Sequence, residues 1–184
     1  MLTWAALEAL VAEGCLIRWS PNGDDPPAEG RALYMTPDVF AAITKQPWPS
    51  SGGEMPRHTQ QRRSAMRQVL ERFVKGLHML IQRDIKELGS VSPLRSHMRG
   101  FWEIRSQGRM EETRLFGFFA RPGAFVATGF KGRGEFEEQA DWDAQRCACE
   151  QQWQFLAGNE KYLAEPWPIT TRSQLAKYVD RNEE

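Results

Sequence analysis

Apolar residues near the start of the chain recur first with the spacing of a helix and then with that of two short strands. Residues 2–11 place leucine, alanine and valine on one helical face, and Gly14 ends this pattern. Short apolar runs at 16–19 and 32–35 predict strands, because the segment 21–27 between them is rich in the turn residues Pro, Asn and Gly. We therefore expect a helix followed by a hairpin.

A second short helix and a linker precede a longer helical pattern. Residues 36–43 predict the short helix, and residues 47–53 have the Pro, Ser and Gly content of a linker. Between 66 and 88 apolar residues keep helical spacing, although Gly76 lies inside this stretch and costs roughly 1 kcal/mol in a helix interior. The pattern predicts one long helix or a helical hairpin. Its other face carries basic side chains that we interpret as a solvated surface: Arg62, Arg63 and Arg67.

Beyond Pro93 the apolar pattern changes from helical to extended. Three β-rich runs occupy residues 101–105, 113–119 and 124–130. The connections at 106–109 and 121–123 have the lengths and residues of hairpin turns, so an antiparallel meander is expected. The aromatic residues of these runs alternate with small or polar residues, which favours a place in the core over base stacking: Trp102, Phe116, Phe118 and Phe119.

The end of the chain returns to helical spacing. Residues 135–155 predict a helix, and a short helix is expected at 175–179. One side of the longer helix carries Phe136, Ala140, Ala144, Cys147 and Ala148. The sequence thus predicts an α+β fold in which a helix or helical hairpin packs on a small antiparallel sheet. We expect a main domain at 57–155, an N-terminal α+β extension at 1–56 and a C-terminal tail at 156–184.

The net charge of zero conceals a separation of charge along the chain. Residues 57–133 hold 16 Lys and Arg against 6 Asp and Glu, whereas residues 1–56 hold 3 against 7 and residues 134–184 hold 5 against 11. Positive charge clustered in one folded region is typical of a site for a polyanion. With no basic leader and no apolar run of about 18 residues, we expect a cytoplasmic protein that does not contact membranes.

The cysteines offer little evidence for a metal or redox site. Cys15, Cys147 and Cys149 are an odd number, and the last two are separated by one residue instead of the two that are usual in zinc and redox sites. We expect reduced thiols, no bound metal and no cofactor.

One order of motifs resembles a known superfamily. A basic amphipathic helix is followed by Leu94, by Gly100 and the run Phe101-Trp102-Glu103-Ile104-Arg105, by Thr113-Arg114-Leu115-Phe116, and by Gly129-Phe130-Lys131 before a charged helix. This order is similar to that of the RelE/ParE toxins, and most closely to the HigB-like, phage-related branch, over about residues 64–150. The resemblance implies a RelE-like fold and a metal-independent cleavage of mRNA, free or ribosome-bound.

The resemblance also implies which residues form the site. Arg105, Arg114 and Lys131 correspond to the basic residues at the ends of the family's strands. Because antiparallel neighbours lie about 5 Å apart, three cations on successive strands can converge on one phosphate, where arginine pairs with two oxygens at once. Arg114 and Lys131 are therefore expected to stabilise the transition state, and Arg105 to position the phosphate or transfer a proton.

Two residues are candidates for the general base. Glu103 either accepts the proton of the ribose 2′-OH or orients an arginine, since alternation places it on the face of Arg105, and His97 titrates in the right range. Further basic residues near turns are expected to grip the RNA backbone: Arg99, Arg109, Arg121 and Arg133.

Three functions follow as competing hypotheses. The first is a type II toxin that cleaves mRNA and is neutralised by an antitoxin protein covering the basic face. The second is a non-catalytic protein that binds nucleic acid or a partner on the same fold. The third is a ParE-like inhibitor of a topoisomerase.

Overall fold

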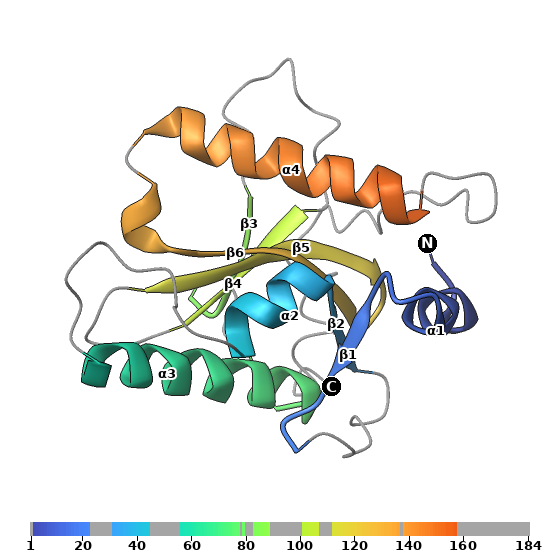
Figure 1. Cartoon of the computed structure of the whole chain (residues 1–184), viewed down its shortest axis with the longest axis horizontal. Coiled ribbons are helices and arrows are strands. Elements are labelled where there is room, and N and C mark those ends of the chain that lie inside the picture. Colours follow the sequence, from blue (N-terminus) through green and yellow to red (C-terminus); the bar gives the residue numbers. More distant parts are fainter. Residues whose placement is uncertain are drawn as a thin grey trace, which may run out of the picture.

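A six-stranded sheet forms the centre of the molecule, with helices on both of its faces (Figure 1). The computed structural model describes residues 2–22, 31–44, 56–77, 79, 83–88, 101–106, 112–136 and 138–157. The predicted linker at 47–53 and the predicted helix at 175–179 lie outside these residues. The α+β class expected from the sequence is confirmed.

The strands pair in the order β1-β2-β6-β5-β4-β3. Antiparallel pairing joins all neighbours except β2 and β6, which run parallel. The sheet is therefore mixed, whereas the sequence predicted an antiparallel one. The strands are β1 (Ile17–Trp19), β2 (Ala32–Met35), β3 (Ile85–Glu87), β4 (Phe101–Arg105), β5 (Thr113–Arg121) and β6 (Ala124–Gly132).

The predicted hairpin and meander are both present in this sheet. Ile17 pairs with Met35 in the β1–β2 hairpin, and β4, β5 and β6 form the expected meander. Parallel pairing of Ala32 with Ala124 then joins the N-terminal hairpin to the meander by continuous hydrogen bonding. Strands β1 and β2 consequently share one sheet with the strands of the basic region.

Helices cover both faces of the sheet. One face is covered by α2 (Pro37–Thr44) and α3 (Pro56–Val74), which in Figure 1 lie below the sheet. The other face packs against α4 (Gln139–Ala157), above the sheet, and against α1 (Trp4–Ala12) at its edge. A short 3-10 helix, η2 (Arg133–Glu135), links β6 to the segment before α4. Each face thus has its own apolar core.

A glycine in the left-handed conformation ends α3. At the end of α3, Gly76 has a φ of 70°, the amide of Gly76 donates to the carbonyl of Phe73, and the amide of Leu77 donates to that of Arg72. This pair of bonds is a Schellman motif, which stops a helix. Helix α3 therefore ends at Val74. The prediction of helix as far as Leu88 is wrong at Ile85–Glu87, which form a strand in which β-branched Ile85 pairs with Ile104.

Two predictions about helix surfaces are also wrong. In α4 the predicted apolar side is exposed at Ala140, Ala144 and Ala148, whereas Trp153 and Leu156 are buried. Large side chains bury far more apolar area than alanine, so they decide which side of the helix faces the sheet. In α3, Arg62 was expected in solvent but is only 4% exposed. Trp102, Phe116, Phe118 and Phe119 are buried in the core, as predicted.

No helix in the described part of the chain is long and apolar enough to cross a membrane. None of the three cysteines forms a disulfide. Cys149 is fully buried, and this burial raises the pKa of its thiol to about 11.

Candidate nucleic-acid interface

Three basic residues form a single row across one end of the meander. Arg105 of β4 pairs directly with Arg114 of β5, and Arg114 pairs directly with Lys131 of β6. Residues that pair directly in a sheet point to the same face, with Cβ atoms about 5 Å apart. The sequence expectation that these cations share one face is therefore confirmed, and the face is the one covered by α4.

A buried carboxylate offsets the repulsion between the two arginines of this row. Glu103 lies two residues before Arg105, and its side chain is only 3% exposed. Its Oε1 accepts from Nε of Arg105 at 2.8 Å, and its Oε2 accepts from Nη1 of Arg114 at 2.8 Å. Like charges placed opposite each other destabilise a sheet, so Glu103 is the group that allows the two guanidiniums to remain adjacent.

This arrangement decides what Glu103 can do chemically. Each of its two oxygens accepts a hydrogen bond from a guanidinium, which is the geometry of a carboxylate that orients arginines. A general base must instead lie within hydrogen-bond reach of the proton that it removes. Of the two roles considered from the sequence, the contacts favour the orienting one.

Accessibility increases along the row from its centre to its end. Arg114 is 4% exposed, and its Nη2 also donates to Oε2 of Glu112 at 3.0 Å. The side chain of Arg105 is 17% exposed, Lys131 is half-buried, and Arg133, just beyond the row in η2, is exposed. Arg114 therefore acts from inside the protein, while Lys131 and Arg133 can meet a ligand from solvent.

Two aromatic side chains pack against Arg114, Lys131 and Arg133. The guanidinium carbons of Arg114 and Arg133 lie 5.1 Å and 5.5 Å from the ring centroid of Trp142. Trp142 stacks on Phe136 with centroids 4.2 Å apart, and Nζ of Lys131 lies 5.4 Å from the centroid of Phe136. Cations within about 6 Å of an aromatic ring are attracted to it. The rings of Trp142 and Phe136 therefore hold Arg133 and Lys131 in place without neutralising them.

The residues before α4 complete the edge of this site. The Glu135 Oε1 accepts from the backbone amide of Gly132 at 2.6 Å, and the guanidinium of Arg133 donates to the Phe136 carbonyl at 2.9 Å. These bonds fix the turn that presents Lys131 and Arg133 side by side at the end of β6. Among the residues that the structure describes, Lys131 has no ion pair with a carboxylate.

The remaining residues predicted for the site are not all part of this group. Arg133 lies beside the row, but Arg121 lies at the other end of β5, about 23 Å from Arg114 at roughly 3.3 Å per residue, where its guanidinium packs on Trp4 at 4.6 Å. His97, Arg99 and Arg109 lie outside the described residues. Arg121 is thus separated from the other cations by the length of a strand.

Glu112 and Trp142 belong to the site but were not predicted from the sequence. Glu112 could have been found, because it precedes Arg114 by two residues, as Glu103 precedes Arg105, and alternation places such pairs on one face. Trp142 could not, since only the packing of α4 brings it over β5.

Within the described ranges, no group of three or more His, Cys, Asp or Glu side chains is arranged to hold a metal ion. The polar chemistry seen here is that of fixed guanidinium and ammonium groups. Such groups bind oxyanions and stabilise negative charge that develops on them.

No protein-family model matches the chain, and neither a curated protein nor a solved structure matches it. What the structure defines is the class: an α+β protein with a mixed six-stranded sheet and, at one end of its meander, a row of cations supported by aromatic rings.

Proposed function

We propose that the protein binds RNA through its phosphodiester backbone at the end of the β4–β5–β6 meander. The observation that carries this proposal is the direct pairing of Arg105, Arg114 and Lys131 in one row, continued at the surface by Arg133. Lys131 and Arg133 contact the phosphates. Buried Arg114 supplies positive potential beneath them, and half-buried Trp142 is the aromatic side chain that packs against a base.

The arrangement of elements supports a RelE-like fold for this part of the chain. Helix α3 packs on one face of an antiparallel meander, and a charged helix, α4, follows the last strand. These are the parts that the resemblance to the HigB-like branch implies. Strands β1, β2 and β3 extend the sheet beyond those parts on both sides.

Cleavage of the bound RNA is the second candidate function, and the convergence of three cations favours it. In this reaction the ribose 2′-oxygen attacks the adjacent phosphorus, and the bond to the 5′-oxygen breaks, which leaves a 2′,3′-cyclic phosphate and a 5′-hydroxyl. Negative charge on the phosphorane oxygens is stabilised by Lys131 and Arg105, and Arg114 strengthens this field. A base takes the 2′ proton, and an acid gives one to the leaving oxygen. His97 stays the proposed base.

Binding is tested with a fluorescent single-stranded RNA and the full chain, by anisotropy across a range of salt concentrations. The variant Lys131→Gln/Arg133→Gln should weaken binding about tenfold and reduce the slope of log K against log salt by about 1.4, since each lost phosphate contact on a single strand contributes about 0.7. The matched control, Arg18→Gln/Lys75→Gln, removes two exposed charges that lie outside the row of cations and should change neither quantity. Equal effects of the two variants would refute a localised site.

Cleavage and toxicity are tested by induced expression in a bacterial host. Growth arrest with rapid loss of intact mRNA supports a toxin of the RelE/HigB type, and such a toxin requires a partner antitoxin that covers the basic face. Arrest with DNA damage supports the ParE-like alternative instead. Normal growth together with RNA binding in vitro identifies a non-catalytic binding protein. If cleavage occurs, Arg105→Gln should slow it more than it weakens binding.

A further inference from the structure

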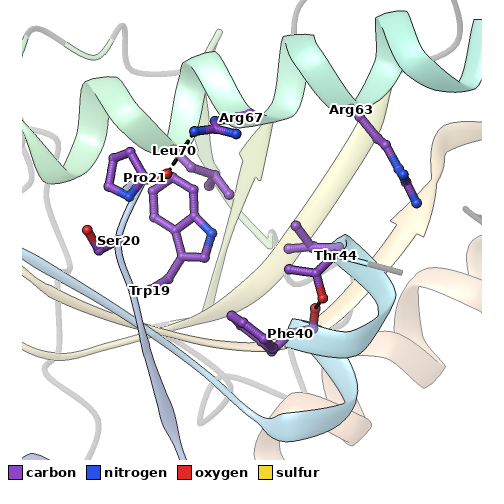
Figure 2. A pocket seen from close by; sticks show the side chains of 9 residues that line it. Trp19, Ser20, Pro21, Phe40, Thr44, Arg63, Arg67 and Leu70 are labelled. Carbon is purple, nitrogen blue, oxygen red and sulfur yellow. Dashed lines mark hydrogen bonds between the residues drawn. The ribbon is translucent and has the colours of Figure 1, made fainter. Parts of the chain in front are cut away.

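A pocket of about 340 Å³ opens on the face of the sheet opposite the row of cations. It lies between α2, α3 and the end of β1, and Figure 2 shows the side chains that line it. The volume is at the lower end of the range found for small-molecule sites, roughly 300–1,000 Å³. Its lining residues are Trp19, Ser20, Pro21, Phe40, Ile43, Thr44, Arg63, Arg67 and Leu70.

The walls of this pocket are mainly apolar and include two aromatic rings. Trp19 is 8% exposed and belongs to the core on this face, with Leu70 beside it, and Phe40 from α2 forms the facing wall (Figure 2). Aromatic rings present flat, rigid surfaces that pack well against another planar group. The shape and chemistry of the walls therefore suit a ligand with a ring.

The charged part of the lining is entirely basic. Arg63 and Arg67 are four residues apart on α3 and so project from neighbouring positions on one side of the helix. The nine lining residues include no Asp or Glu. A ligand with an oxyanion group would consequently be attracted, because guanidinium groups pair well with carboxylates and phosphates.

One hydrogen bond at the rim positions Arg67 to bind an anion. Nη2 of Arg67 donates to the carbonyl of Pro21 at 2.7 Å, which holds the guanidinium across the pocket beside Trp19 (Figure 2). Its Nε donates to Oε1 of Glu71 at 2.8 Å, one turn further along α3. This hydrogen bond lowers the pKa of Glu71 below its usual value, so the carboxylate is ionised at neutral pH. Glu71 therefore competes with any anion for Arg67.

We propose that this pocket binds a small organic anion in which a planar ring carries a phosphate or a carboxylate. The ring lies between Trp19 and Phe40, and the oxyanion meets Arg67 and Arg63. The site is separate from the proposed RNA interface, because α2 and α3 cover one face of the sheet and the row of cations lies on the other.

The binding test uses the full chain and isothermal titration calorimetry with four probes. Adenosine monophosphate and indole-3-acetate each combine a ring with an oxyanion, whereas adenosine and inorganic phosphate each have one part only. The proposal expects at least one of the first two to bind about tenfold more tightly than both single-part probes. Absence of binding by both at millimolar concentration would overturn the proposal.

Variants then assign the binding to this pocket. Arg63→Gln/Arg67→Gln should weaken the better probe at least tenfold, and Thr44→Trp should block it by filling the pocket with no change in charge. Glu71→Gln should strengthen binding severalfold, since it removes the competing carboxylate. The control Lys131→Gln/Arg133→Gln removes two charges from the opposite face and should have no effect.

Two outcomes with these variants would show that the probe does not bind in this pocket. If the control weakens the probe as much as Arg63→Gln/Arg67→Gln does, or if Glu71→Gln and Thr44→Trp leave it unchanged, the probe binds elsewhere and the proposal fails. Thermal melting of each variant shows that it is folded. Because RNA binding uses other residues, failure of this proposal leaves the proposed function intact, and failure of the proposed function leaves this pocket intact.

Discussion

The substitution Glu103→Gln examines the buried ion network directly, because it removes a charge and keeps the shape of the side chain. The Glu103 side chain is 3% exposed and that of Arg114 is 5% exposed. Two unit charges about 4 Å apart attract by about 4 kcal/mol at an effective dielectric constant of 20. Breaking a buried pair by neutralising one partner costs about 3–5 kcal/mol.

The expected loss lies at the lower end of that range, because Glu112 still neutralises part of the charge of Arg114. We therefore expect Glu103→Gln to reduce the free energy of unfolding by about 3 kcal/mol, measured by urea denaturation. For a chain of this size each kcal/mol lowers Tm by about 2–4 °C, so Tm should fall by about 6–12 °C.

Glu112→Gln is the matched control, since it removes a carboxylate from the same arginine at the surface. The Glu112 side chain is 36% exposed, and pairs of that kind contribute about 0–1 kcal/mol. A double-mutant cycle of Glu103→Gln with Arg114→Met should give a coupling energy of about 1–3 kcal/mol. If Glu103→Gln melts within about 2 °C of Glu112→Gln, the carboxylate does not hold the arginines and the reasoning fails.

Three further perturbations test a close contact, a buried thiol and a helix cap. Gly117→Ala would press a Cβ against the Val126 carbonyl, so urea unfolding should show a loss of about 1–3 kcal/mol; an unchanged stability would contradict the close approach of β5 and β6. Because burial raises the pKa of Cys149 from 9.0 to about 11, the unfolded state loses this proton first as pH rises, and the free energy of unfolding should fall between pH 9 and 11. At pH 8.5 iodoacetamide should modify half-buried Cys15 well before Cys149, by mass spectrometry of the folded protein, and equal rates would contradict the burial. Thr3→Ala should cost about 1 kcal/mol and Thr3→Ser much less, because the hydroxyl of Thr3 accepts from an amide of the first turn of α1; equal losses in urea would exclude the cap.

Local patterns in the sequence were sufficient for most elements and for the row of cations. Alternation along β4 placed Glu103 on the face of Arg105, and the hairpin-length connections brought Arg105, Arg114 and Lys131 to successive strands. These predictions succeeded because side-chain direction in a strand has a period of two and hairpins join neighbours.

The predictions that failed concern interactions between distant residues. The helical hairpin considered from the sequence already puts a break at Gly76, but helical spacing cannot reveal that Ile85 pairs with Ile104, because the strand gains its stability from a partner elsewhere in the chain. The burial of Arg114 likewise depends on the packing of Trp142 from α4. Alternation along the strand predicted the position of Arg114, whereas its burial could not be predicted from the sequence.

The parallel pairing of β2 with β6 has a consequence for the order of events in folding. Ala32 to Met35 emerge early during synthesis, yet their partners Ala124 to Ala127 follow only after α2, α3, β3, β4 and β5. Contacts between such distant residues form slowly, because a long loop must close first. Until then one edge of β2 has no partner strand, and an open edge is a template for pairing with other chains. In the nascent chain this edge of β2 should therefore stay open to other chains until β6 has been made.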